Sequence, residues 1–305
     1  MAVLQLPFLG CGPGNPPEIG SPPTNQPILN LKLNQSIGPS LGNGTYLVDP
    51  SAVAVNDLGE IYISDKAKNT IYKLSPNLEL IGAEGGIGSG SGSLNHPVGM
   101  AFDAALNIYV AEPGNRRISI LDRNLHFVRN YKAYNDDDEQ SVDFDTPRDV
   151  SLDREGNLWV ADDSRCVKLT PFFDLQLEIS NDSRGYPIIG EIISLRVARN
   201  SLVAIADRGS RQVILVRTLG TYISKFPVET PDAIAWDKNG NIWVVSEGKL
   251  YAYDINGTIK FEFAENSPNS RIIWVAFDIA GNMYTLDSGD KRLRIYEVIY
   301  GASAN

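Results

Sequence analysis

The sequence repeats one short pattern six times. Each copy contains an alternating run of apolar residues, a turn, a second alternating run that ends in an acidic residue or a serine, and a third alternating run. The clearest copy spans residues 95–121. The other copies begin at Pro50, Pro147, Ile192, Pro231 and Ile272. Because every copy must form the same unit, this self-similarity constrains the fold more than any single residue does.

Each copy is predicted to form β-strands. Apolar residues occupy every second position, as at Val53, Val55, Ile61 and Ile63, and many of them are β-branched or aromatic. Turns that contain glycine, such as residues 153–156, separate the first two strands. A fourth, less regular strand follows the third one in each copy. Four antiparallel strands of this kind make one blade of a propeller.

The spacing of the copies supports the same architecture. The residues that end the second strand are Asp65, Glu112, Asp162, Asp207, Ser246 and Asp287. They recur about every 40 to 50 residues, a period typical of propeller blades and not of helical solenoids. The sequence therefore predicts an all-β fold, a six-bladed β-propeller of four-stranded antiparallel blades.

Three motifs in the second copy carry a resemblance to a known family. They are the Pro-x-Gly-x-Ala-x-Asp pattern at 97–103, the segment Asn-Ile-Tyr-Val-Ala-Glu at 107–112 and the segment Asn-Arg-Arg-Ile at 115–118. With these motifs the chain resembles the NHL-repeat β-propellers from about position 30 to 300. The resemblance implies the fold but not one activity, because the family includes lyases, relatives of hydrolases, RNA binders and plain binding modules.

The ring is predicted to close through an N-terminal strand. The last copy supplies three strands up to Tyr300, so its outermost strand must come from elsewhere. Residues 28–33 alternate well and precede a glycine-containing linker at 36–42. Pairing them with the last blade would remove an exposed sheet edge. We therefore expect an NHL-like propeller over residues 28–305 and a separate tail over residues 1–27.

The tail is rich in proline and glycine, and its role stays open. Residues 1–11 resemble the end of a bacterial lipoprotein signal, in which Cys11 would be lipidated, although no Lys or Arg precedes the apolar stretch. The alternatives are an arm that grips the propeller or a neighbouring subunit, and a flexible linker. We expect the protein outside the cell or on the cell surface, or alternatively as a subunit of a virus particle or another large assembly.

Charge and composition exclude several classes of partner. The net charge is −10, which opposes docking on nucleic acid and on anionic membranes. No apolar run reaches the length of a transmembrane helix, so a lipid at Cys11 would be the one membrane attachment. Cys11 and Cys166 lie far apart in the sequence and do not indicate a disulfide framework.

The candidate binding residues are expected at the mouth of the central channel. The positions two residues after each blade's first proline, or its equivalent, are Ala52, Gly99, Asp149, Ser194, Ala233 and Trp274. Together with neighbouring side chains they give a predicted ligand- or partner-binding set of Arg148, Asp149, Ser194, Arg196, Asp232 and Trp274. The same arc could equally form a hydrated mouth without a ligand, because a site needs convergent geometry.

Arg196 is unusual among its equivalents, which are all small. A charge at such a position must be paired or hydrated, and the nearest candidates for a partner are Asp149 and Asp207. We expect the loss of Arg196 to destabilise the fold more than the loss of a surface arginine such as Arg123.

The acidic residues have two interpretations. Those that end the second strands could bind a metal, but their place at strand ends suits hydrogen bonds to turn amides. The run Asp136, Asp137, Asp138 and Glu139, followed by Asp143 and Asp145, lacks the ligand spacing and central glycine of a calcium loop. It is interpreted as a solvated acidic loop, with weak calcium binding as the alternative.

The residue inventory favours a non-catalytic protein. His96 and His126 are the two histidines, and both belong to one blade, so the three-imidazole zinc site of amidating-lyase relatives cannot be assembled. The inner positions that would form a lactonase-like calcium centre are mostly alanine and glycine. We predict no catalytic residue, metal site or cofactor, and a binding or scaffold module for a protein or glycan. The alternative is a metal-dependent hydrolase or lyase over the channel, with Asp149, Asp232 and Arg196 as its acid–base set.

Overall fold

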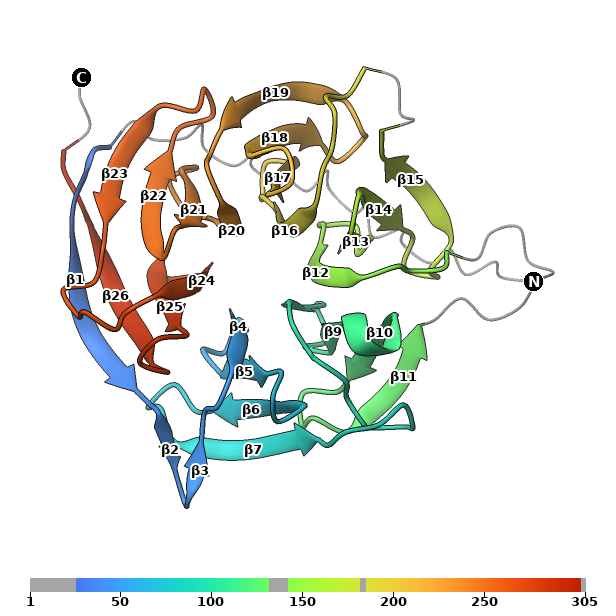
Figure 1. Cartoon of the computed structure of the whole chain (residues 1–305), viewed down its shortest axis with the longest axis vertical. Helices are drawn as coiled ribbons and strands as arrows, with labels where there is room; N and C mark the ends of the chain where they lie inside the picture. The colour runs from blue at the N-terminus through green and yellow to red at the C-terminus, as the bar shows by residue number, and fades with distance from the viewer. Residues whose placement is uncertain (1–25, 132–141, 182–184, 303–305) are drawn as a thin grey trace, which may run out of the picture.

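The computed structural model describes residues 26–131, 142–181 and 185–302. Six four-stranded antiparallel sheets stand around a central axis, which confirms the predicted six-bladed propeller (Figure 1). The innermost strands of successive blades pack beside one another and line the channel. No helix in the described part of the chain is long and apolar enough to span a membrane.

The blades are numbered here by their innermost strands, and the strands of each are given from the innermost outward. Blade 1 contains β4 (Pro50–Val55), β5 (Ile61–Asp65), β6 (Thr70–Leu74) and β7 (Leu80–Gly85). Blade 2 contains β8 (Met100–Phe102), β9 (Ile108–Glu112), β10 (Arg117–Leu121) and β11 (Phe127–Tyr131). Blade 3 contains β12 (Pro147–Leu152), β13 (Leu158–Asp162), β14 (Arg165–Leu169) and β15 (Leu175–Ile179).

The second half of the ring has the same organisation. Blade 4 contains β16 (Ile192–Val197), β17 (Leu202–Asp207), β18 (Gln212–Arg217) and β19 (Tyr222–Pro227). Blade 5 contains β20 (Pro231–Trp236), β21 (Ile242–Ser246), β22 (Lys249–Tyr253) and β23 (Ile259–Phe263). Blade 6 contains β24 (Ile272–Phe277), β25 (Asn282–Asp287), β26 (Leu293–Tyr300) and β1 (Ile28–Ile37). A short hairpin of β2 (Ser40–Gly42) and β3 (Thr45–Tyr46) and a 3₁₀ turn, η1 (Pro113–Asn115), lie outside the blades.

The closure of the ring follows the prediction. β1 pairs antiparallel with β26, with a register that runs from Ile28 opposite Tyr300 to Ile37 opposite Leu293. The strand continues past residue 33 into residues that the sequence placed in a linker. It can do so because β26 has 8 residues, whereas the third strands of the other blades have 5 or 6. The longer partner offers hydrogen bonds as far as Ile37.

Gly38 ends this strand for a steric reason. Its φ is +120°, and a Cβ atom there would stand 2.2 Å from the backbone oxygen of Lys291. Only a residue without a side chain can pass so close to the neighbouring backbone in that conformation.

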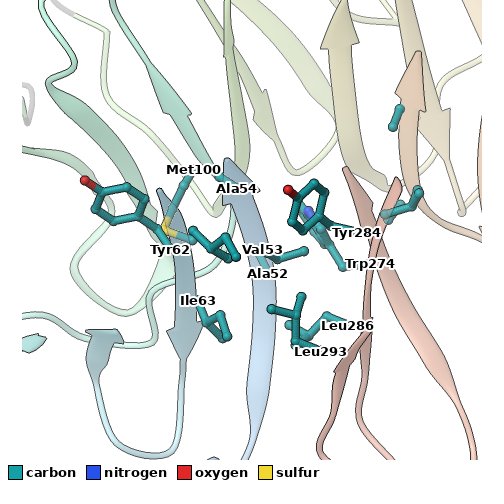
Figure 2. Close-up of a cluster of buried hydrophobic side chains, with 14 of the residues drawn as sticks. Ala52, Val53, Ala54, Tyr62, Ile63, Met100, Trp274, Tyr284, Leu286 and Leu293 are labelled. Atoms are coloured by element: carbon teal, nitrogen blue, oxygen red, sulfur yellow. The ribbon is translucent and has the colours of Figure 1, made fainter. Parts of the chain in front are cut away.

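The core lies in the interfaces between blades. Between blades 6 and 1, Val53 of β4 faces the larger side chains Trp274, Tyr284 and Leu286 (Figure 2). Val53 is fully buried there, and Ala52, on the other face of the strand, is fully buried against blade 2. Alternation of small inner and large outer residues lets wedge-shaped blades meet around an axis. Each fully buried Val, Leu or Ile stabilises the fold by about 1.5 to 3 kcal/mol.

Candidate functional site

All innermost strands begin at the same end of the channel. There the first residue of the strand pairs with the residue that ends the second strand, as Pro50 does with Asp65 and Pro147 with Asp162. We call this end the mouth face. A cavity of about 410 Å³ opens on it.

A β-bulge directs side chains into this cavity. The pairing of the first two strands shifts after the first residue in five blades, so that the next residue is left unpaired. Those residues, and Val98 at the equivalent place in blade 2, all line the cavity: Ser51, Val98, Arg148, Ile193, Asp232 and Ile273. A bulge re-aims one side chain of its strand, which explains why this position faces the mouth in those five blades.

The predicted ring of inner positions lies one residue further along each strand. Of Ala52, Gly99, Asp149, Ser194, Ala233 and Trp274, Trp274 alone lines the cavity. Of the predicted binding set, Arg148, Asp232 and Trp274 lie at the mouth, whereas Asp149, Ser194 and Arg196 lie beneath it. The sequence predicted the residue one position further along, which is paired in the sheet, because the residue pattern does not reveal the bulge.

A second ring of mouth residues was missed altogether. The residue directly after the acid that ends the second strand lines the cavity in four blades: Lys66, Pro113, Arg208 and Ser288. The recurrence of the acids could have identified this ring, because the chain must turn at the mouth face immediately after each of them.

Asp149 is the centre of the polar cluster beneath the mouth. Its side chain is fully buried, and its Oδ2 accepts hydrogen bonds from Ser194 Oγ at 2.6 Å and from the amide of Leu195 at 3.1 Å. Arg196 Nη1 lies 2.5 Å from the same oxygen, which confirms the predicted ion pair and selects Asp149 over Asp207. Asp149 Oδ1 accepts the amide of Val150 at 2.8 Å. This carboxylate is therefore hydrogen-bonded through both oxygens.

Gly99 makes room for Asp149. A Cβ atom at position 99 would lie 2.1 Å from Asp149 Oδ1 and 2.6 Å from its Cα. The amide of Gly99 also donates to the backbone oxygen of Arg148 at 3.0 Å. The glycine of blade 2 and the aspartate of blade 3 thus fit together as one contact.

Arg196 connects blades that are not adjacent in the ring. From β16 its guanidinium carbon lies 5.3 Å from the centre of the Trp274 ring in blade 6, a cation–π distance. The same guanidinium donates to the backbone oxygen of Leu195 at 2.7 Å. The Arg196 side chain is 17% exposed, so this charge is both paired and largely buried.

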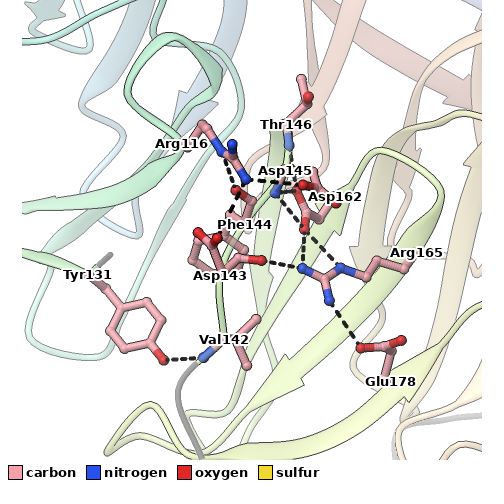
Figure 3. Close-up of polar contacts among 10 residues, drawn as sticks. All are labelled: Arg116, Tyr131, Val142, Asp143, Phe144, Asp145, Thr146, Asp162, Arg165 and Glu178. Atoms are coloured by element: carbon pink, nitrogen blue, oxygen red, sulfur yellow. Dashed lines mark hydrogen bonds and ion pairs between the residues drawn. The ribbon is translucent and has the colours of Figure 1, made fainter. Parts of the chain in front are cut away.

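The acids that end the second strands bind turn amides, as predicted. Asp65 accepts the amide of Val48 at 2.6 Å, and Asp162 accepts the amide of Thr146 at 2.7 Å. Arg165 also pairs with Asp162 at 2.9 Å (Figure 3). In each case the acid holds the segment that enters the innermost strand. Glu112, Asp207 and Asp287 make equivalent bonds to the amides of Asn95, Gly190 and Arg271.

The environment of Asp287 shows how hydrogen bonds offset the cost of burying one of these carboxylates. Burial raises the pKa of this carboxyl, but hydrogen bonds from Ser270 and from the amides of Arg271, Asp290 and Gly289 outweigh it, and the net pKa is lowered. Across residues 26–131, 142–181 and 185–302, no group of three or more His, Cys, Asp or Glu side chains is arranged to hold a metal ion.

Other predicted features lie away from the mouth or outside the described residues. Asp143 and Asp145 lie 3.6 and 3.1 Å from Arg116 in the segment that leads into blade 3 (Figure 3). Residues 136–139 and Cys11 lie outside the described residues. Cys166 is buried, and burial raises the pKa of its thiol, so it is unreactive at neutral pH.

The two histidines do not meet. His126 lies in an exposed turn, with Nδ1 3.3 Å from Asp122 Oδ2, and His96 Nδ1 lies 2.8 Å from Asn95 Oδ1. Neither of them lines the mouth cavity.

Charged pairs surround the mouth. Lys66 Nζ lies 3.4 Å from Asp49 Oδ2, and Arg148 Nη2 lies 2.6 Å from Glu191 Oε1. Arg208 forms an ion pair with Asp232. Arg271 also lines the cavity and has no carboxylate within ion-pair distance in the described part of the chain. The wall of the cavity thus carries the basic side chains of Lys66, Arg148, Arg208 and Arg271 against the acidic ones of Asp49 and Asp232.

Comparison with known proteins supports the repeat assignment. No protein-family model matches the chain. NHL repeat-containing protein 3 of Homo sapiens is 33% identical over 79 residues, which are 25% of this chain and 23% of that protein. The Mus musculus protein of the same name is 32% identical over 79 residues. The chain is a six-bladed β-propeller that is similar to NHL-repeat proteins. The match spans less than a quarter of the length of these curated relatives.

Solved structures share the fold of this NHL-repeat-like propeller. Virginiamycin B lyase from Staphylococcus aureus superposes with a TM-score of 0.61 at 14% identity, covering 88% of this chain and 100% of the lyase. A streptogramin B lyase superposes with a TM-score of 0.58 at 17% identity, covering 82% of this chain and 79% of that one. A protein assigned as a gluconolactonase gives a TM-score of 0.66 at 14% identity, covering 91% and 96% of the two chains. At these identities the likeness shows the fold alone.

Proposed function

We propose that this propeller is a non-catalytic binding or scaffold module for a protein or glycan partner, outside the cell, on the cell surface or in a multi-subunit assembly. The acidic net charge of −10 supports a partner other than nucleic acid. The proposal assigns the recurrent acids and the Asp149 cluster to the framework of the ring.

The saturation of Asp149 is the observation that carries the proposal. A catalytic base or a metal ligand must be reached by its substrate or ion, but Asp149 is fully buried and does not line the mouth cavity. Its carboxylate, with about four lone-pair sites, already accepts four donors, from Val150, Ser194, Leu195 and Arg196. Arg196 forms an ion pair with Asp149, and Asp232 forms an ion pair with Arg208. The residues that would form an acid–base set are therefore engaged in structural contacts.

The alternative is a metal-dependent hydrolase or lyase with a site over the channel. It is supported by the fold alone, because structural neighbours include lyases and a protein assigned as a gluconolactonase. A histidine-to-alanine variant of the virginiamycin B lyase is catalytically inactive. In this chain neither His96 nor His126 lines the mouth cavity, which weighs against the same chemistry.

Metal analysis of purified protein separates the two functions. We expect elemental analysis and calcium titration to find no tightly bound divalent ion. One tightly bound ion per chain that is lost in Asp149→Asn, but kept in the exposed control Arg199→Gln, would support the enzyme instead. For the binding module, an array of glycans then distinguishes a glycan partner from a protein partner.

The location is tested through Cys11. If residues 1–11 end a lipoprotein signal, full-length protein made in a bacterium should partition with membranes and a Cys11→Ser variant should not. Equal partition of both proteins into the soluble fraction would contradict a lipid anchor and favour the arm or linker interpretation of residues 1–27.

A further inference from the structure

We propose that the mouth cavity binds a small organic acid, a carboxylate carried on an apolar or aromatic body. The cavity volume of about 410 Å³ falls within the range of small-molecule sites. This site goes beyond the proposed role in binding a protein or glycan and does not depend on it.

The charges at the mouth favour a single negative group. The pairs Lys66–Asp49 and Arg208–Asp232 are internally neutral, and Arg148 is balanced by Glu191, which does not line the cavity. Of the four cations that line the cavity, Arg271 is the one without a carboxylate within ion-pair distance among the described residues. Although the whole protein is acidic, at physiological ionic strength charges farther than about 8 Å away are screened, so these local groups dominate the field at the mouth.

Two buried hydrogen-bond donors strengthen the case. Arg148 Nε and Trp274 Nε1 are both buried and have no hydrogen-bond partner in the described part of the chain. Both residues belong to the wall of the cavity. A buried donor without a partner is destabilising. Neither nitrogen is reached by solvent, so a ligand oxygen removes that cost when the side chain turns its donor toward the cavity.

Part of the wall is apolar, although the hydroxyl groups of Ser51 and Ser288 also line it. Val98, Ile193, Ile273 and the ring of Trp274 lie among the charged groups. An inorganic ion gains no stabilisation from contact with an apolar surface, whereas burial of an apolar or aromatic part of a ligand against it is favourable.

The count of charges selects a carboxylate over a phosphate ester. One unpaired guanidinium matches one negative charge, and the fork of an arginine binds the two oxygens of a carboxylate through parallel hydrogen bonds. A phosphate monoester would bring a second charge without a second free cation, close to Asp49, Asp232 and Glu191.

Calorimetric titration with phenylacetate tests the site on the full chain. We expect saturable binding of one phenylacetate per chain that weakens as salt rises from about 20 to 200 mM. Phenylacetamide, which keeps the ring and loses the charge, should bind at least about tenfold more weakly, the size of one charge-assisted hydrogen bond.

Variants locate the binding. Arg271→Gln should weaken phenylacetate binding by at least about tenfold, whereas Arg199→Gln, on an exposed turn of blade 4, should leave it unchanged. Both arginines are exposed, so neither change is expected to unfold the protein. Absence of saturable binding, equal binding of the amide, or binding indifferent to Arg271→Gln would each overturn the proposal. Tighter binding of phenyl phosphate than of phenylacetate would overturn the choice of a carboxylate.

Discussion

Arg196 of blade 4 and Asp149 of blade 3 form an ion pair across the blade interface, with Nη1 2.5 Å from Oδ2. Asp149 is fully buried, so removal of the arginine leaves a carboxylate without its counter-charge. The cost of breaking such a pair is about 3 to 5 kcal/mol when both groups are buried, and because Arg196 is 17% exposed we expect a loss somewhat below this range.

The first prediction follows from this pair. Arg196→Ala should lower the free energy of unfolding in urea by about 2 to 3 kcal/mol, against less than about 0.5 kcal/mol for the exposed control Arg199→Ala. Equal losses for the two variants would contradict a structural role for the pair. Arg123, named as a surface arginine from the sequence, is unsuitable as a control because its Nη2 lies 2.8 Å from the buried Glu60.

The contact between Gly99 and Asp149 gives a second prediction. Gly99→Ala should destabilise the protein by about 1 to 3 kcal/mol or more, because its Cβ would overlap Asp149 and the backbone there cannot retreat without breaking the blade interface. Gly90→Ala is the matched control, since its Cβ would meet no atom closer than 3.9 Å. Thermal unfolding of both variants checks the expectation, and similar midpoints would show that blade 2 adjusts freely.

Glu60 provides a third prediction, on pH. Hydrogen bonds from Arg123, together with those from Asn56 and Lys73, outweigh burial and lower the pKa of Glu60 from 4.5 to about 2. A carboxyl with a lowered pKa contributes stability that is fully present above pH 4.5 and is lost as the pH falls toward about 2. The shift corresponds to roughly 3 kcal/mol of folding stability. Because Arg123 is 47% exposed and solvent screens its charge, we expect a contribution of about 1 to 2 kcal/mol.

Urea unfolding across a pH series measures this contribution. The stability difference between the parent protein and Glu60→Gln should be largest above pH 4.5 and should shrink toward about pH 2. Glu297→Gln, which removes an exposed ion pair with Lys32, should show a small difference throughout. A Glu60→Gln difference that is constant with pH would argue against the lowered pKa.

A fourth prediction concerns closure of the ring. Removal of residues 1–37 deletes β1 and exposes the edge of β26, so the truncated protein should unfold at a lower urea concentration and associate more readily. Removal of residues 1–20 leaves β1 intact and should change neither property. Identical behaviour of the two truncations would mean that blade 6 is stable with three strands.

The six-bladed architecture could be predicted from the sequence because each blade repeats the same short pattern of strands and turns. The six copies, the strand that closes blade 6 and the amide-binding role of the recurrent acids all follow from short patterns that each blade repeats. The partner of Arg196 could be inferred as well, because a large charge among small equivalents needs a neighbour and few acids lie at the same level of adjacent blades.

The mouth cavity was less accessible. Which residue faces the mouth depends on a one-residue bulge at the start of the innermost strand in five blades, and the alternation of apolar residues is the same with or without it. The contact of Arg123 with Glu60 was missed for a related reason. It joins turns of blades 1 and 2 that lie side by side only once the ring has formed.

The pairing of Ile28 with Tyr300 also determines how the protein presents itself. β26 runs away from the mouth face and β1 runs toward it, so the amide of Gly301 meets the carbonyl of Pro27, at 2.8 Å, on the opposite side of the ring. The described chain therefore enters and leaves the ring on the face opposite the mouth cavity. A rigid attachment made directly at Pro27 or Gly301 would leave that cavity facing solution.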